Sequence, residues 1–292
     1  MLSSGISGLQ VIENYGTVAI FTMAKRIPGR LFLQNLVERR SLLFQLVRRD
    51  FEQRFVGSAA GWVWALIHPL VLLVSWTYVF QVCLKVPLDA DAPTRSYPLY
   101  LFSGMLPWLL FSETVQRSAS SVLDHASLIT KTVFPAEIVP VSVFLSQTVS
   151  HLLALVLMLA AAGYWQHVLS PYLLLMPVFL LGIGLFAVGW GWMVAGLHVF
   201  LRDTAQALSV ALTFWFWLTP IMITEKQVPA PARFLLVINP MRYAVRAYRQ
   251  MLLTTAPPRF RDFAALTVSG AIAFVAGGLF FRHMKRGFAD VL

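Results

Sequence analysis

Few residues of this chain have the types and spacing of a catalytic centre. The six histidines never form the H-E-x-x-H pattern of zinc proteases, and neither the G-x-x-x-x-G-K-[ST] phosphate loop nor the G-x-S-x-G nucleophile motif occurs. We therefore expect no catalytic residues, no metal site and no ATP hydrolysis within this chain. If the protein performs an energy-requiring process, the energy must come from elsewhere.

Asp89 and Asp91 form a paired-carboxylate motif of the kind that can hold a divalent cation together with a sugar nucleotide. This motif alone supports one alternative interpretation, a membrane glycosyltransferase. An acidic, solvated loop explains the two residues without any bound ion, and we favour that interpretation because a two-residue motif is weak.

Glu113 is an ionisable residue in otherwise apolar sequence. It precedes Arg117 by four residues, which is the favourable order for an ion pair on a helix. Charges within membrane helices are commonly satisfied by such pairs. We therefore predict a structural Glu113–Arg117 pair rather than a contact with substrate.

The elements that position these residues follow from an apolar composition. Of the 292 residues, 58% are hydrophobic and 12% are charged, and the formal net charge is +10. Such a chain has lipid as its solvent. In a membrane protein an excess of Lys and Arg marks the cytoplasmic loops, so no nucleic-acid partner is needed to explain it. The single Cys83 excludes an intrachain disulfide.

Stretches without Asp, Glu, Lys or Arg define the spans, because a helix needs about 20 apolar residues to cross about 30 Å of hydrocarbon. Five such stretches occur, and the longest, 138–201, is divided near 163–171 by aromatic and turn residues. We therefore predict an all-α membrane protein with six transmembrane helices. They are expected at about 61–84, 98–120, 139–163, 171–197, 205–224 and 263–281.

Lys and Arg fall mainly on one side of these spans. Fourteen of the 23 lie before the first span or near the cytoplasmic ends of the others, on the side that holds both termini. The positive-inside rule thus places the N and C termini in the cytoplasm. Seven of the remaining nine lie between Lys226 and Arg261, in the segment between the fifth and sixth spans.

That segment, 230–256, is too short and too basic to cross a bilayer, but it is apolar enough to enter one. An apolar run, Phe234–Ile238, is followed by Asn239-Pro240 and then by a basic, amphipathic stretch that ends at Leu253. This pattern predicts a pair of short re-entrant helices with a proline break, a structure tolerated where it packs against protein or lines a wet cavity.

The N-terminal arm has a different pattern. Leu43, Val47, Phe51 and Phe55 repeat every four residues, while charged and amide side chains occupy the other face. The spacing predicts an amphipathic helix over 36–57 that lies in the cytoplasmic interface; a solvated charged arm is the alternative. The organisation is then a cytoplasmic extension over 1–35, this helix, and a six-span transmembrane domain over 58–292.

Short polar strings along the chain resemble those of a known family, the permease subunits of ABC exporters for bacterial surface polysaccharides. This family includes the O-antigen, capsule and wall teichoic acid permeases. The strings cover the chain from about residue 36 onwards and occur in the same order. They are Arg49-Asp50, Arg54-Phe55-x-Gly57-Ser58, Gly61-Trp62-x-Trp64-Ala65, Gly104-x-x-Pro107-Trp108, Leu128-Ile129-x-Lys131, Phe134-Pro135-x-Glu137, Arg202-Asp203, Thr219-Pro220 and Asn239-Pro240.

The resemblance implies a homodimer in the bacterial inner membrane with two copies of a separate ABC ATPase, which would hold the ATP and Mg²⁺. It implies export of a lipid-linked polysaccharide along a path at the subunit interface. The residues that would meet the ATPase are Arg49, Asp50, Arg54, Leu128, Lys131, Phe134, Glu137, Arg202 and Asp203. Those of an outer gate would be Asn239, Pro240, Arg242, Tyr243, Arg246 and Tyr248.

Aromatic side chains offer stacking surfaces that suit sugar rings without strong positional demands. The candidates for the translocation path are Trp62, Trp64, Trp76, Tyr78, Phe80, Trp108, Phe111, Phe214, Trp215 and Trp217. Packing inside the membrane, or an interfacial aromatic belt, is the simpler explanation for any one of them. A permease for a drug or another lipid shares the same scaffold and stays open as an alternative substrate class.

Overall fold

The structure, a computed structural model, describes residues 40–54, 57–58, 60–90, 92–131, 134–167 and 170–291, with the side chains of all but 131, 289 and 290. The chain divides into two units, Met1–Leu43 and Phe44–Leu292. The contacts discussed below lie within the second unit. The expected extension over 1–35, the expected helix start at residue 36, and Phe55 and Asp91 lie outside the described residues.

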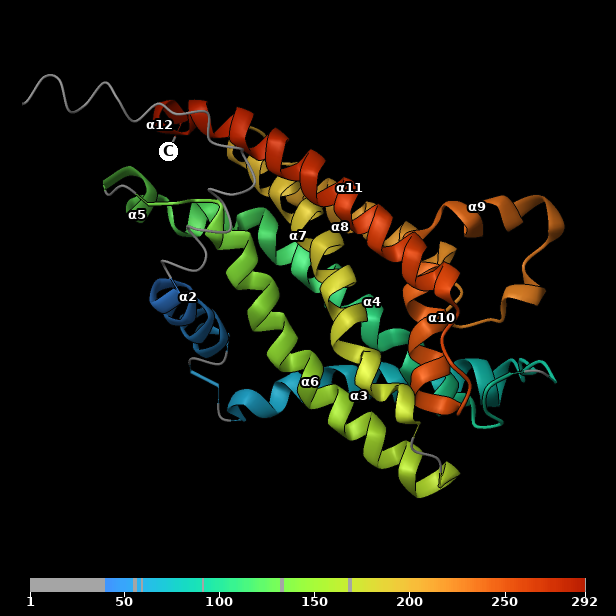
Figure 1. Ribbon diagram of the computed structural model, residues 1–292. Coiled ribbons are helices and arrows are strands. Elements are labelled where there is room, and N and C mark those ends of the chain that lie inside the picture. The colour runs from blue at the N-terminus through green and yellow to red at the C-terminus, as the bar shows by residue number, and fades with distance from the viewer. Residues whose placement is uncertain are drawn as a thin grey trace, which may run out of the picture. The chain divides into compact units, whose positions relative to one another are not determined.

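The described part of the chain is all-helical, which confirms the predicted fold class (Figure 1). The longer elements are α2 (Arg40–Gln53), α3 (Trp64–Thr77), α4 (Tyr97–Asp124), α6 (Ile138–Gln166), α7 (Met176–Phe200), α8 (Thr204–Leu218), α10 (Pro240–Leu253) and α11 (Phe260–Met284). The short helices are η1 (Gly61–Val63), η2 (Tyr78–Cys83), α5 (Ala126–Lys131), η3 (Pro171–Leu175), η4 (Glu225–Gln227), η5 (Ala230–Ala232), α9 (Arg233–Ile238), η6 (Lys285–Gly287) and α12 (Phe288–Val291).

Four continuous helices within the described residues are long and apolar enough to cross a membrane. They are Gly61–Cys83, Ile138–Gln166, Pro171–Phe200 and Phe260–Gly287. The predicted second and fifth spans correspond to α4 and α8. The first of these is long but more polar, and the second has 15 residues. Six spans therefore stay a prediction.

Helix α4 lies among its neighbours rather than at the periphery. It packs against α6, α7 and α10, and its side chains from Leu99 to Trp108 are almost all buried (Figure 1). Most of the surface of such a helix meets protein rather than lipid, so it need not be apolar throughout. This position explains how α4 can carry Glu113 and Arg117, whereas Asp124 is exposed at the end of the helix.

Helices α7 and α11 lie side by side and approach through glycine (Figure 1). A Cβ placed on Gly189 would lie 2.3 Å from the backbone carbon of Ala273, and one on Gly277 would lie 2.1 Å from the carbonyl oxygen of Gly189. Small residues of this kind let membrane helices pack backbone against backbone. The pair forms a close-packed frame, and α4 packs against its α7 side.

The fifth predicted span, 205–224, is too long. Helix α8 ends at Leu218, and Thr219 adopts an extended conformation. The following residue, Pro220, disfavours helical geometry at the position before it and has no N–H to donate. A charge-free run therefore continued past the true end of the helix.

The predicted helix pair between the last two spans is present as α9 and α10, and Asn239 separates them. Helix α10 packs against α4 and α11, and most of its side chains are buried within the protein. Its relation to the bilayer stays a prediction.

We predict that Gly277→Ala destabilises the α7–α11 contact. The added methyl group meets backbone atoms, which cannot rotate away, and such overpacking typically costs about 1–3 kcal/mol. The midpoint of thermal unfolding in detergent should fall. Gly163→Ala is the matched control, because a Cβ there meets nothing within 4 Å. Equal midpoints for the two variants would contradict the proposed role of the close approach.

Candidate functional site

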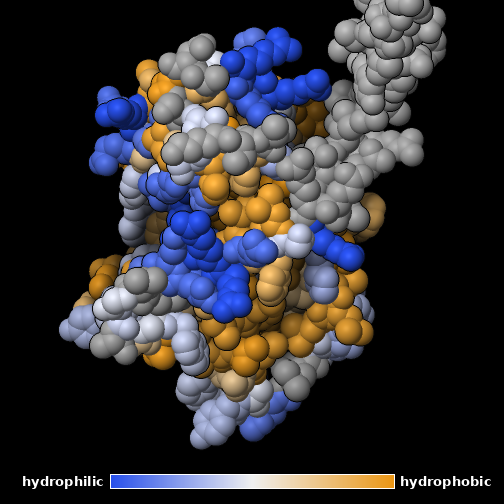
Figure 2. All heavy atoms as spheres, turned by 90° about the vertical axis from the view of Figure 1, so that its left-hand side faces the viewer, coloured by the Kyte–Doolittle hydropathy of each residue, from blue (hydrophilic) through white to orange (hydrophobic). Residues whose placement is uncertain are grey.

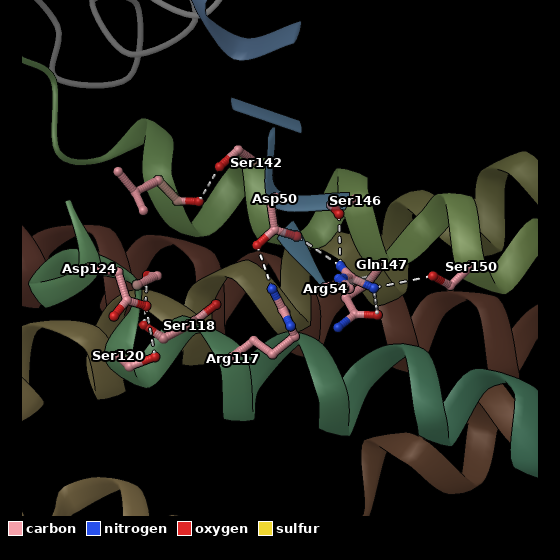
Figure 3. Close-up of polar contacts among 12 residues, drawn as sticks. Asp50, Arg54, Arg117, Ser118, Ser120, Asp124, Ser142, Ser146, Gln147 and Ser150 are labelled. Atoms are coloured by element: carbon pink, nitrogen blue, oxygen red, sulfur yellow. Dashed lines mark hydrogen bonds and ion pairs between the residues drawn. The ribbon is translucent and has the colours of Figure 1, made fainter. Parts of the chain in front are cut away.

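One carboxylate anchors the amphipathic helix to the rest of the second unit. Asp50 Oδ2 accepts from Nη2 of Arg54 at 2.9 Å, and Oδ1 accepts from Nη2 of Arg117 at 2.6 Å. Arg54 follows α2 directly, whereas Arg117 belongs to the central helix α4. Figure 3 shows Asp50 between the two guanidinium groups. Helix α2 is thus fixed to α4 by an ion pair across 67 residues of sequence.

Arg54 extends this anchor to α6. Its Nη1 donates to Gln147 Oε1 at 3.0 Å and to Ser150 Oγ at 3.2 Å, and its Nη2 donates to Ser146 Oγ at 2.7 Å. The three acceptors lie along one side of α6 (Figure 3). A single guanidinium group therefore joins the arm to the third predicted span through neutral partners.

The surroundings of Asp50 keep its carboxylate charged. Burial alone would raise the pKa, but the Ser146 hydroxyl and the guanidinium groups of Arg117 and Arg54 outweigh it, so the pKa lies below its usual value of 3.8. A depressed carboxylate pKa contributes stability at neutral pH that is lost only as the pH falls through the lowered value. The anchor is therefore intact throughout the physiological range.

The other residues expected to meet the ATPase lie around this anchor and beyond it. Arg49, Arg202 and Asp203 are exposed, and Leu128 and Phe134 are partly buried at α5 and just after it. The side chain of Lys131 lies outside the described part. Figure 2 shows the face that carries α2 and α5, where hydrophilic residues gather between stretches of hydrophobic surface.

Glu137 is already paired within the chain. Its carboxylate accepts from Lys285 Nζ at 2.8 Å, and its carbonyl oxygen accepts from Trp192 Nε1 at 3.0 Å. Phe200 and Phe288 also meet here, with ring centroids 6.1 Å apart. The start of α6, the end of α7 and the segment after α11 are thereby joined at one end of the second unit.

At the other end, two of the sequence strings meet through Asn239. Its Oδ1 accepts from the backbone N–H of Met241 at 3.0 Å, which caps α10, and from Trp215 Nε1 at 2.9 Å. Its Nδ2 donates to Thr219 Oγ1 at 2.9 Å. The Asn-Pro and Thr-Pro strings are therefore two halves of one junction between α8 and α10.

The basic face of α10 is neutralised inside the protein. Arg242 pairs with Glu225, and Arg246 pairs with Asp262 and lies 3.5 Å from Glu225. Burial alone would raise the pKa of Glu225, but the hydrogen bond from Arg242 and the charge of Arg246 lower it below its usual value. These arginines therefore pair with carboxylates of the loop before α9 and of α11 rather than standing free at a surface.

Arg249, which was not among the predicted gate residues, is the most deeply buried of the α10 arginines. It donates to the carbonyl oxygens of Pro220 at 2.8 Å and Ile221 at 2.7 Å, and its guanidinium carbon lies 3.6 Å from the ring centroid of Tyr100. Gly104 makes room for it, since a Cβ there would lie 2.8 Å from Nη2. The spacing of Arg242, Arg246 and Arg249 at i, i+4 and i+7 is the signal that could have found it.

The remaining predicted gate residues are tied to the same region. Tyr243 donates from its hydroxyl to the carbonyl of Val237 at 2.8 Å, which holds α10 to α9. Tyr248 is fully buried, and its hydroxyl lies 3.1 Å from Nε2 of His151 on α6. Pro240 occupies the first turn of α10, where its missing N–H leaves no gap in the helix.

The candidate path aromatics separate into two sets. Trp108, Phe111 and Trp215 contact one another inside the core, with centroid distances of 5.2–6.4 Å. Exposed side chains on α3, α8 and the residues next to α3 form the second set, which consists of Trp62, Trp64, Tyr78, Phe214 and Trp217. Trp76 and Phe80 are half-buried between these sets, and Trp76 contacts Phe216 at 4.9 Å.

A cavity of about 330 Å³ opens beside the anchor. It is lined by Arg54, by Glu113 and Arg117 of α4, and by residues of α3 and α6. The predicted Glu113–Arg117 ion pair is absent among the described residues, because Arg117 turns to Asp50. The carboxylate of Glu113 instead lies 3.9 Å from Nδ1 of His68.

Within the described residues, no three His, Cys, Asp or Glu side chains lie together as a metal site would require. Of the Asp89–Asp91 pair only Asp89 is described.

Residues 41–253 match the model of a family described as ABC-2 type transporter. The O-antigen export system permease protein RfbA of Myxococcus xanthus is 28% identical over 263 residues, which cover 88% of this chain and 98% of the relative. A protein of the same description from Klebsiella pneumoniae is 23% identical over 252 residues, 86% and 95% of the two chains. The polysialic acid transport protein KpsM of Escherichia coli is 23% identical over 215 residues, 71% and 80%. These relatives confirm the resemblance that the sequence strings indicated.

We predict that Asp50→Asn loosens helix α2. The neutral amide loses the charge that two arginines share, and a hydrogen bond to a charged group contributes about 1.5–3 kcal/mol. Hydrogen exchange of the backbone amides over 44–54 should become about tenfold faster or more. Glu52→Gln is the matched control, since Glu52 is exposed and pairs with the exposed Arg48. If both variants exchange like the unmodified protein, Asp50 does not anchor the arm.

Proposed function

Because the chain belongs to the ABC-2 type transporter family, we propose that it is the transmembrane subunit of an ABC exporter for a lipid-linked surface polysaccharide. The observation that carries this proposal is the alignment with O-antigen export permeases over 98% and 95% of their lengths. The relative named for polysialic acid transport supports the same substrate class. The chain is a multi-pass membrane protein and a transport subunit rather than an enzyme.

The proposed topology has six spans in the bacterial inner membrane, with both termini in the cytoplasm. In this topology α4 and α8 are the second and fifth spans, beside the four helices that are long and apolar enough to cross a membrane. The arginines of α10, which oppose this orientation in a simple count, are paired with Glu225, Asp262 and backbone carbonyls. Charges neutralised in this way do not anchor a segment at the cytoplasmic surface, so they are compatible with an outer, re-entrant gate.

The proposed energy source is a pair of separate ABC ATPase subunits that bind ATP and Mg²⁺. Exposed Arg49, Arg202 and Asp203 offer contacts to them, as do α5 and the segment after it. A push on α2 would pass through Asp50 to Arg117 on α4, and through Arg54 to Ser146 on α6. The arm is thus attached to both α4 and α6, so a movement of the ATPase that displaces the arm would act on both helices.

The proposed assembly is a homodimer, with the translocation path between the two copies. Helices α3 and α8 adjoin through Trp76 and Phe216, and both expose apolar side chains. These exposed side chains are Val71 and Val74 of α3, Tyr78 of the following η2, and Val210, Phe214 and Trp217 of α8. A second copy could cover part of this face, and its aromatic residues could stack against sugar rings as a chain slides past.

Deletion of the gene is expected to leave the polysaccharide attached to its lipid carrier inside the cell. Lipid extracts separated by mass would show the accumulated glycan, and surface glycan would fall to background. Expression of the unmodified chain should reverse both changes. Normal surface glycan in the deletion strain would overturn the proposed substrate.

Cross-linking tests the proposed dimer. In a Cys83→Ser background, which removes the single cysteine, Val74→Cys or Phe214→Cys should give a covalent dimer with a short thiol-specific cross-linker in membranes. Val275→Cys on α11 is the matched control, because it is 59% exposed and equally apolar. A dimer that forms only through position 275 would place the interface elsewhere.

A further inference from the structure

The cavity between α3, α4 and α6 has two chemically different parts. Its apolar wall consists of Ala65 and Pro69 of α3, Leu106, Leu109 and Leu110 of α4, and Ala154 of α6. Its polar end carries Arg54, Glu113 and Arg117. The volume of about 330 Å³ lies within the range of small-molecule sites, about 300–1,000 Å³. An occupant should therefore be amphiphilic.

The polar end offers a cation that the protein does not fully use. Arg54 is committed to the fold, because both of its Nη atoms donate to Asp50 or to α6. Arg117 donates from Nη2 to Asp50, and among the described residues its buried Nε, like that of Arg54, has no hydrogen-bond partner. A guanidinium group with unused donors at a cavity wall is suited to a phosphate oxygen.

Glu113 supplies a hydrogen-bond acceptor to the same cavity. Among the described residues its carboxylate forms no ion pair with an arginine, and Nδ1 of His68 lies 3.9 Å from it. A charged carboxylate repels a bare phosphate but accepts hydrogen bonds from hydroxyl groups. Trp64 lines the same cavity and presents an aromatic surface to a sugar ring.

We propose that this cavity binds the junction of a lipid phosphate and its first sugar, with the phosphate at Arg117, the sugar hydroxyls at Glu113 and the lipid chain along the apolar wall. The three parts are needed together. A lipid phosphate without sugar leaves Glu113 opposed to an anion, and a neutral glycolipid leaves the Arg117 donors unused. The inference rests on the proposed function, because it assigns part of that substrate to a place in the fold.

Four defined probes separate the contributions. Glucosyl dodecyl phosphate carries all three parts; dodecyl phosphate lacks the sugar, dodecyl glucoside lacks the phosphate, and glucose 1-phosphate lacks the lipid chain. Binding is measured at equilibrium with radiolabelled glucosyl dodecyl phosphate on the full chain in phosphatidylcholine nanodiscs, with the others as competitors. We expect glucosyl dodecyl phosphate to bind about tenfold or more tightly than each of the other three.

Two substitutions should show opposite patterns. Arg117→Gln should weaken dodecyl phosphate about tenfold and leave dodecyl glucoside unchanged, whereas Glu113→Gln should weaken dodecyl glucoside and leave dodecyl phosphate unchanged or tighter. Glu113→Gln breaks no ion pair with an arginine, so it serves even if Arg117→Gln fails to fold. The controls Arg282→Gln and Glu52→Gln, both exposed and outside the cavity, should bind all probes normally.

Equal affinity for dodecyl phosphate and glucosyl dodecyl phosphate would overturn the proposal, as would Glu113→Gln binding every probe like the unmodified chain. Export assays separate this failure from that of the proposed function. If the site is wrong and the function right, cells with Glu113→Gln export polysaccharide at the unmodified rate. If the proposed function is wrong, the unmodified chain restores no export to the deletion strain.

Discussion

The rest of the structure depends on how charge is held where water is scarce, and Asp50 is the clearest case. An unpaired charge in a low-dielectric environment is very costly, so each must find an opposite charge or several dipoles. Asp50 satisfies this requirement for Arg117 and Arg54 at once. By doing so it joins a short amphipathic helix to the central helix of the protein. Breaking this link is costly because it would leave several partly buried charges without an opposite charge at once.

The same constraint shapes the opposite end by different means. Within the part of the chain that the structure describes, no carboxylate contacts the buried Arg249, which is held by carbonyl oxygens and by the ring of Tyr100. Those carbonyls are free because Thr219-Pro220 ends α8 and leaves acceptors outside a helix. The break in one helix and the arginine of another therefore depend on each other. Asn239 closes the junction from the second side.

Between these two ends lies a frame that has little polar chemistry. The glycines of α7 and α11 bring the two backbones together. Van der Waals packing stabilises this contact, because lipid supplies no hydrophobic driving force between helices. Helix α4 packs against α7 of this frame and carries residues of both ends, Arg117 at the anchor and Tyr100 at the junction of α8 and α10. A displacement of α4 would therefore move residues at both ends.

The sequence by itself determined the helices, because their length and apolar content are local properties. It also determined the family, because the polar strings are read in order along the chain. The end of α8 is a local property as well, because Pro220 disfavours helical geometry at Thr219, but a count of charge-free residues does not register the proline.

Partners across the fold were decided by the tertiary structure alone. A helix-local rule predicted that Glu113 would pair with Arg117, yet Asp50 competes for that arginine from 67 residues away. In the sequence Arg249 looks like a surface cation, but in the structure Pro220, Ile221 and Tyr100 contact it. Local spacing fixes which residues share a helix face, but only packing decides which charge reaches which, and so which side chains remain free to bind.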